Sequence, residues 1–395
     1  MSMFSTYGSG TEAQRKPSTL KKLERMRATF AHEEADRVPI SDFFWGGFRD
    51  RWRKELDLPA DADPYYHYDL DFIVTVPNMD PHIRPFETIR EDDEEVVLKT
   101  GFETTVRKRF DLPMPEQISW ETDTIEKMEA FVFDDPTDQR RYFEAGDNQI
   151  AGVGDGFERN SPPWVETVRS LHVDFPVYGS ITEASEVTTR LLGQLNTLTW
   201  IGEYPERFGE QLLRIGDFSY EVTKAQIEAA DGYLDGMVIW GDAAYRKGLF
   251  MGPTYWRKYY KPTVARIIEL CHEHGLPVIY HGCGNANSYL EDMIEIGLDG
   301  YNPLEAKADL DVVELRERLG HRLTFCGNSD MRVWERGDPE EVRREVLHRL
   351  HAAYGGGYVF MSDHSVSNDV SGHTYDLIVK TVREYGVYPL NLPEE

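Results

Sequence analysis

Short apolar runs rich in β-branched and aromatic residues alternate with longer segments of helical periodicity through most of the chain. Eight runs have the length and composition of strands, at residues 37–43, 71–78, 175–181, 235–242, 277–283, 298–305, 322–328 and 357–364. Between the later runs lie segments of helical period, several ending in glycine, at residues 253–275, 287–297, 309–320 and 339–357. This alternation predicts an α/β fold, a (β/α)8 TIM barrel whose catalytic groups lie at the carboxyl ends of the strands.

The alternation breaks between the second and third predicted strands. Residues 79–173 are acidic and β-prone, and the turn "KTGF" at residues 99–102 joins two β-prone runs, which is typical of a hairpin. We interpret this segment as a β-rich insertion that forms either a lid or wall of the pocket, or a surface decoration. The rest of residues 19–390 is then a single barrel domain, and residues 1–18 are expected to be disordered.

The charge balance limits the classes of partner. Lys and Arg number 43 against 70 for Asp and Glu, which gives a formal net charge of −27 and disfavours nucleic acid and anionic membrane as general partners. No apolar run is long enough for a membrane span, and the first twenty residues lack the apolar core of a signal peptide, so we expect a cytoplasmic protein. The three cysteines give no disulfide framework.

Polar groups that can bind metals gather at the predicted strand ends. His281 and Cys283 are two residues apart in "PVIYHGCGN", so on an ideal strand both side chains point to the same face. Zinc binds imidazole nitrogen and thiolate sulfur, which makes this pair a candidate metal site. The alternative is a histidine bonded to a main-chain carbonyl beside a small buried cysteine.

Other strand-end residues are candidates for the remaining roles. Cys326 could be a third metal ligand or a core cysteine, while Cys271 lies on the apolar face of a predicted helix. His364 could be a ligand or a general acid or base, since its ordinary pKa is near neutrality, and Asp242 could complete a tetrahedral site. Candidate substrate-binding residues at the same ends are Asn78, Asn328 and Asp363.

An aromatic segment follows the first predicted strand. Phe44 and Trp45, in "SDFFWGGFRD", are placed to form the wall of an apolar substrate pocket, although ordinary packing beneath the loop explains them as well. The nearby arginines at positions 49, 51 and 53 have the spacing of a solvated helix face.

The chain from "DRVPI" to "REYG" resembles the uroporphyrinogen decarboxylase superfamily, which also contains cobalamin-dependent methyltransferases. The resemblance lies mainly in "YRKGLFMGPTYWRKYYKP", "PVIYHGCGN", "IGLDGYNPLE", "FCGNSD" and "GGGYVFMSDHSVSNDV". It implies a TIM barrel. The decarboxylases carry an R-Q-A-G-R segment after the first strand, where this chain has "SDFFWGGFRD".

The methyltransferase branch looks closer, because its zinc ligands are an H-x-C pair and a distant cysteine. His281 and Cys283 match the pair, and His364 stands where that third cysteine is expected, which leaves His364 and Cys326 as rival third ligands. Asp242 lies where some members have a carboxylate ligand. The resemblance implies a zinc-dependent transfer of methyl between a small methylated compound, such as a methoxylated aromatic, and cobalamin.

The cobalamin is expected on a separate corrinoid protein, because the chain contains no D-x-H-x-x-G signature. Two other functions are carried as alternatives. A cofactor-free decarboxylase would use Asp42 or Asp242 with His364, and a non-catalytic binding protein would use His281 and Cys283 for packing or a closed metal site. A homodimer is the default expectation for such an enzyme.

Overall fold

A curled parallel sheet of seven strands forms the centre of the computed structural model, consistent with a TIM-like barrel. The structure describes residues 11–112, 114–150 and 157–393. The strand order is β1-β8-β9-β12-β13-β14-β15, and every neighbouring pair is parallel. The strands are β1 (Ile73–Val74), β8 (Val177–Thr182), β9 (Gly236–Trp240), β12 (Val278–His281), β13 (Gly300–Asn302), β14 (Thr324–Cys326) and β15 (Tyr358–Val359).

The first of the eight predicted strands, residues 37–43, is not a strand in the structure. Pro39 has no N–H to donate, and the N–H of Ile40 donates to the Asp71 carboxylate (2.7 Å) instead of to a neighbouring strand. Ile40 still forms a parallel bridge with Phe360, and its carbonyl accepts from the N–H of Asp71 (2.8 Å). This segment therefore lies between the two edges of the sheet and contacts both.

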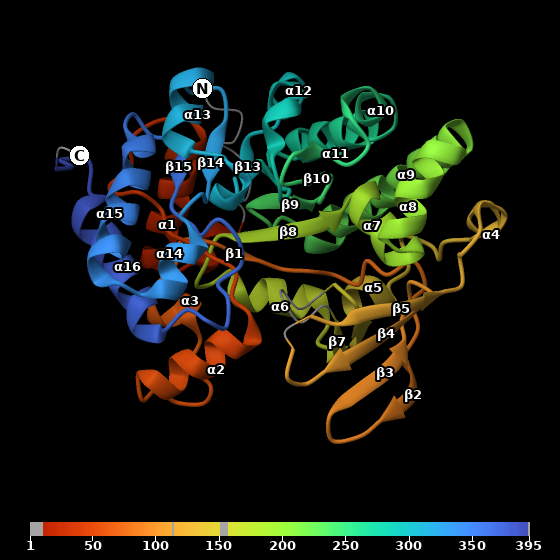
Figure 1. Ribbon diagram of the computed structural model, residues 1–395. Coiled ribbons are helices and arrows are strands. Elements are labelled where there is room, and N and C mark those ends of the chain that lie inside the picture. The colour runs from red at the N-terminus through yellow and green to blue at the C-terminus, as the bar shows by residue number, and fades with distance from the viewer. Residues whose placement is uncertain (1–10, 113, 151–156, 394–395) are drawn as a thin grey trace.

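Helices surround the sheet on its outer side (Figure 1). Each of the four predicted helical segments contains one, although residues 253–275 divide into two at Tyr260. The helices outside the insertion are α1 (Pro17–Phe30), α2 (Gly46–Glu55), α3 (Pro64–His67), α7 (Ala184–Leu192), α8 (Gln194–Glu203), α9 (Pro205–Ala230), α10 (Pro253–Tyr259), α11 (Lys261–Glu273), α12 (Leu290–Glu295), α13 (Val312–Leu319), α14 (Met331–Arg336), α15 (Pro339–Leu350) and α16 (Gly372–Tyr385). In the described part of the chain, none is long and apolar enough to cross a membrane.

Inward-facing strand residues form an apolar cluster inside the curled sheet. Val238, Ile279, Cys326 and Val359 belong to it, together with Phe30 at the end of α1. A Cβ on Gly300, the first residue of β13, would lie 3.2 Å from the Phe30 ring. Helix α1 therefore packs against the amino-terminal ends of the strands, and the carboxyl ends are left for the site.

The described residues between β1 and β8 form small antiparallel sheets and short helices. The first has the order β2-β3-β4-β5, and β3 and β4 pair as a hairpin around residues 100–103. In Figure 1 this sheet projects at the lower right, away from the main sheet. The elements are β2 (Glu87–Glu91), β3 (Glu95–Lys99), β4 (Thr104–Arg109), β5 (Glu116–Trp120), α4 (Ile125–Ala130), α5 (Arg140–Phe143), β6 (Gly146–Asn148), β7 (Glu158–Ser161) and α6 (Trp164–Leu171).

The sequence predicts disorder over residues 1–18, but residues 11–18 are ordered. Residues Glu12–Gln14 form a 3-10 helix, and α1 begins at Pro17. Arg15 is buried and forms an ion pair with Asp235 (2.7 Å). Residues 1–10 lie outside the described part of the chain.

Candidate metal centre

Neighbouring strands bring the candidate ligands together at the carboxyl edge of the sheet. In the parallel ladder, His281 at the end of β12 pairs with Trp240 of β9 on one side and with Asn302 of β13 on the other. Asp242 follows β9 by two residues, and Cys283 follows β12 by two. Groups far apart in sequence thus meet because their strands end side by side.

A side-chain amide fixes the orientation of His281. Its Nδ1 lies 2.5 Å from Oδ1 of Asn302, whose Nδ2 donates to the carbonyl of Cys326 (3.0 Å). Because an amide oxygen only accepts, Nδ1 carries the proton and Nε2 keeps a free lone pair. Burial lowers the pKa of His281, which favours the neutral ring that a metal requires.

The turn after β12 folds Cys283 toward two carboxylates. Its N–H donates to Oδ1 of Asp242 (2.8 Å), and the next N–H, that of Gly284, donates to Oε2 of Glu305 (3.0 Å). Gly284 has a φ of 85°, and a Cβ there would lie 2.7 Å from the Ala244 main chain. Only glycine fits this position, so the second glycine of "HGCG" is needed for the turn itself.

In the part of the chain that the structure describes, two groups of three residues have ligand atoms within 4.8 Å of one another: Asp242 with His281 and Cys283, and Cys283 with Glu305 and His364. The Nε2 of His281 and the Sγ of Cys283 are 3.7 Å apart. Two ligands bound to one tetrahedral zinc at about 2.0 to 2.3 Å would be separated by roughly 3.5 Å. The spacing therefore fits zinc with only a small adjustment.

The electrostatics of the cluster also favour a cation. Burial raises the pKa of Cys283 well above its ordinary range, and the charges of Asp242 and Glu305 raise it further. Burial likewise raises the pKa of Asp242. Burial lowers the pKa of His364 to about 4, so its ring is neutral at neutral pH. A divalent cation would supply the positive charge that lets the thiol ionise as a ligand.

Two acidic residues at or beside the cluster, Glu305 and Glu186, are not among the residues that the sequence predicts for the site. Glu305 closes a predicted strand, so its position at the rim could have been used to find it. Glu186 lies in the first turn of α7, pairs with Arg190 (3.4 Å) and shares a hydrogen bond with Asp242. A helix position carries no strand-end signal, so the pattern could not have indicated Glu186.

Cys326 is a correction to the expected ligand set. It is the last residue of β14, it is fully buried, and it packs in the apolar cluster inside the sheet with Ile279 and Met361. Neither group of potential ligands in the described residues includes it. Its side chain points inward one layer below the rim, so it belongs to the core.

Asp42 is also enclosed and does not face the cluster. Its Oδ1 accepts from the N–H (2.9 Å) and the hydroxyl (2.6 Å) of Ser362, and its Oδ2 accepts from the Tyr375 hydroxyl (3.0 Å). Burial raises the pKa of its carboxyl to about 7. Asp42 joins the first strand-end segment to the last, and both its oxygens already have donors, while its catalytic role stays a prediction.

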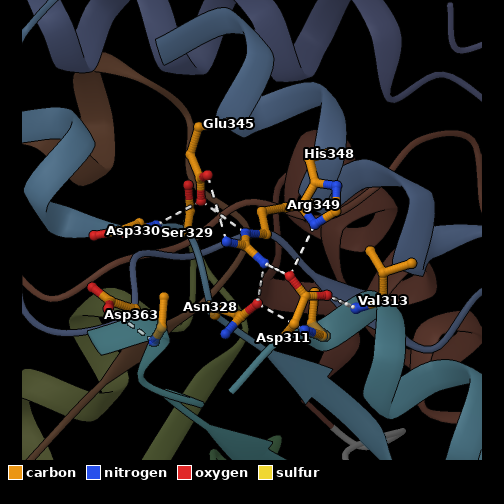
Figure 2. A network of polar contacts seen from close by, with 12 residues as sticks. Asp311, Val313, Asn328, Ser329, Asp330, Glu345, His348, Arg349 and Asp363 are labelled. Atoms are coloured by element: carbon orange, nitrogen blue, oxygen red, sulfur yellow. Dashed lines mark hydrogen bonds and ion pairs between the residues drawn. The ribbon is translucent and has the colours of Figure 1, made fainter. Parts of the chain in front are cut away.

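Asn328 and Asp363 are buried and take part in a network of polar contacts, and their substrate contacts stay predictions (Figure 2). The Oδ1 of Asn328 accepts from Arg349 (2.7 Å), and its Nδ2 donates to the carbonyl of Leu304. The Oδ2 of Asp363 accepts from the N–H of Ala306 (3.0 Å). These two side chains hold the main chain immediately before and after Glu305.

A cleft of about 450 Å³ lies between the aromatic rim and the insertion. Phe44 lines it but is packed among Phe48, Tyr65 and Tyr375. The other residues that line the cleft include Phe43, Arg49, Val76, Phe157, Ser161 and Trp164. Residues of the insertion therefore form one of its walls.

The remaining predicted substrate-binding residues are Trp45 and Asn78, which contact different parts of the structure. Trp45 meets the ring of His364 edge-on, with ring centroids 5.9 Å apart. Asn78 donates to the carbonyl of Asp147 (2.8 Å) and lines a second cavity inside the insertion. The structure thus brings Trp45 toward the cluster and places Asn78 away from it.

A model of the family described as uroporphyrinogen decarboxylase (URO-D) matches residues 154–385, more than half of the chain. The chain belongs to the uroporphyrinogen decarboxylase family. Uroporphyrinogen decarboxylase of Shewanella loihica is 24% identical over 344 residues, which cover 84% of this chain and 83% of that protein. Uroporphyrinogen decarboxylase of Thermus thermophilus is 28% identical over 169 residues, 41% of this chain and 44% of that protein.

Among solved structures, a methyltransferase from Methanosarcina mazei is similar, with a TM-score of 0.60 at 15% identity. The match covers 93% of this chain and 99% of that one. At this identity the likeness shows a shared fold. Members of the uroporphyrinogen decarboxylase family and a methyltransferase thus share this architecture, and the site residues must separate the two chemistries.

Proposed function

We propose that this protein is a zinc-dependent methyltransferase that moves a methyl group from a small methylated compound to a corrinoid carried by a separate protein. The observation that carries the proposal is the His281 and Cys283 pair, with donor atoms 3.7 Å apart among Asp242, Glu305 and His364. Such a mixed nitrogen, sulfur and oxygen set suits zinc, and more potential ligands are present than a tetrahedral ion needs.

The residues of the chain would hold the ion and the substrate in place. His281 and Cys283 would bind it, with the third ligand from Asp242, or from Glu305 or His364. Bound zinc supplies a Lewis acid that stabilises negative charge on the leaving atom. The methyl group would pass to the corrinoid of the partner protein without its bonding electrons, and the substrate oxygen would keep the electron pair and take a proton from solvent.

The rim cleft suits an aromatic substrate. Its volume of about 450 Å³ is within the usual range for small-molecule sites, and Phe43, Phe44 and Tyr65 line one side. The ring of Phe43 lies 6.0 Å from the ring of His281, centroid to centroid. A methoxylated aromatic compound in this cleft would therefore lie close to the proposed zinc.

A spectroscopic assay tests this function. The purified protein loaded with zinc is mixed with free cob(I)alamin and a panel of methoxylated aromatic compounds, and methylation of cobalt is followed by absorbance. We expect methylation with at least one donor and none after the zinc is chelated. Methylation that proceeds at the same rate in the chelated protein would reject the proposed chemistry.

A decarboxylase is the second candidate, because the curated relatives carry that name. In that reaction a carboxylate would hold a protonated electron-sink ring. Asp42 already accepts three hydrogen bonds and is fully buried, and the family's R-Q-A-G-R anchor is replaced by "SDFFWGGFRD". Release of carbon dioxide from a porphyrinogen without zinc would favour this candidate.

A further inference from the structure

Four arginines line a cavity inside the insertion, away from the candidate metal centre. The cavity has a volume of about 320 Å³ and lies between the segment after β1, helix α5 and the hairpin of β6 and β7. Its guanidinium groups belong to Arg84, Arg140, Arg141 and Arg159, whereas only two carboxylates line it, from Glu144 and Asp147. A local excess of arginine stands out in a chain with a formal charge of −27.

Arg141 is buried without a carboxylate partner. It is 1% exposed, and its guanidinium donates to the main-chain carbonyls of Asn78 (3.0 Å), Asp80 (2.8 Å) and Asp135 (3.1 Å). Within the described residues it forms no ion pair. Burial raises the pKa of the nearby Asp80 carboxyl to about 7, so this carboxyl supplies only part of a counter-charge at neutral pH. Arg141 is thus a buried cation held mainly by neutral carbonyl groups, that of Asp134 (3.4 Å) included, and a bound anion would stabilise it further.

The other three arginines surround the cavity with differing partners. Arg84 forms an ion pair with Glu103 (2.7 Å), and Arg140 forms one with Asp138 (2.7 Å). Arg159 donates to the Thr88 hydroxyl (3.0 Å) and has no acidic partner in the described part of the chain.

The two acids of the wall form no ion pair with its arginines in the described residues. The carboxylate of Asp147 accepts from the main-chain N–H groups of Phe86 (2.5 Å) and Asn160 (3.0 Å), so both its oxygens are occupied. Glu144 is exposed to solvent. Arginine presents a planar fork of donors that matches carboxylate and phosphate oxygens.

We propose that this cavity binds a small organic anion through carboxylate or phosphate oxygens, at a site separate from the metal centre. The cavity shares Val76, Ser161, Pro162 and Trp164 with the rim cleft, so an occupant lies against the back of the cleft wall. This site does not depend on the proposed methyl transfer, because none of its residues belongs to the metal cluster.

Calorimetric titration of the full chain at low ionic strength tests this site, with succinate, inorganic phosphate and the neutral diamide of succinate as probes. We expect one of the two anions to bind, which identifies the favoured oxyanion, and the diamide not to bind. R159Q and R140Q remove exposed arginines of the wall, and each should weaken binding about tenfold. R109Q, on β4 of the same insertion and paired only with Asp111, is the matched control and should leave affinity unchanged.

Three results would overturn the proposal: no binding of either anion, equal binding of the diamide, or equal affinities in R159Q, R140Q and R109Q. Chelation of zinc should leave anion binding unchanged. A failure of the proposed methyl transfer and a failure of the proposed anion site can therefore be told apart.

Discussion

Replacing Cys283 with alanine will reduce the zinc content from about one ion per chain to less than about a tenth, and will abolish zinc-dependent methyl transfer. The reason is geometric. Cys283 is the member common to both groups of potential ligands, so without it no set of three remains among the described residues. Its side chain is only partly buried, so we expect the metal-free variant to unfold within about 1 kcal/mol of the metal-free parent.

Cys326 provides the matched control. C326A removes a fully buried thiol from the apolar cluster inside the sheet, so it should cost roughly 1 to 3 kcal/mol of stability and keep the zinc. Elemental analysis and urea unfolding of both variants measure the two effects. Zinc retained by C283A, or lost by C326A, would show that the ligand set is assigned incorrectly.

Replacing Arg349 with methionine will destabilise the protein by about 3 to 5 kcal/mol, because it breaks a buried ionic network. The guanidinium lies between Glu345 (2.7 Å), Asp311 (2.5 Å) and Oδ1 of Asn328 (2.7 Å), as Figure 2 shows. The Arg349 side chain is 8% exposed and that of Glu345 is 11% exposed. Loss of the Arg349 guanidinium leaves the Glu345 carboxylate without its cation and the Asn328 amide oxygen without this hydrogen-bond donor.

The control is R322M, which removes an arginine with a half-exposed side chain paired to Glu291 (2.8 Å). Exposed pairs contribute little, so we expect a change below about 1 kcal/mol. The free energy of unfolding in urea distinguishes the two. Similar losses in R349M and R322M would mean that the network behind Glu305 does not stabilise the fold.

The hydrophobic pattern of the chain predicts most of the fold, because short apolar runs that form buried parallel strands alternate with longer segments of helical period. Seven of the eight predicted runs contain a strand of the main sheet. The exception is residues 37–43, which form only isolated bridges, because Pro39 has no N–H to donate and the N–H of Ile40 donates to the Asp71 side chain. No local pattern shows where such a side-chain bond will form, because Asp71 lies thirty-one positions away from Ile40.

The same reasoning explains which site residues could be predicted. The two-residue spacing of His281 and Cys283 predicts that they lie close together, and their donor atoms are 3.7 Å apart, although a turn and not the strand carries Cys283. Cys326 lies in the apolar cluster inside the sheet, because the end of an apolar run does not show whether its last side chain faces the interior or the rim. The roles of Asn328 and Asp363 could not be derived from the sequence, because buried loops need polar groups too and composition does not separate the two uses.

The central claim is that His281 and Cys283 bind zinc together. The most direct test is the zinc X-ray absorption spectrum of the protein, purified without a histidine tag and dialysed against metal-free buffer. We predict a zinc edge with one sulfur neighbour at about 2.3 Å and nitrogen or oxygen neighbours at about 2.0 to 2.1 Å. A protein without zinc, or a spectrum without a sulfur neighbour, would contradict the account.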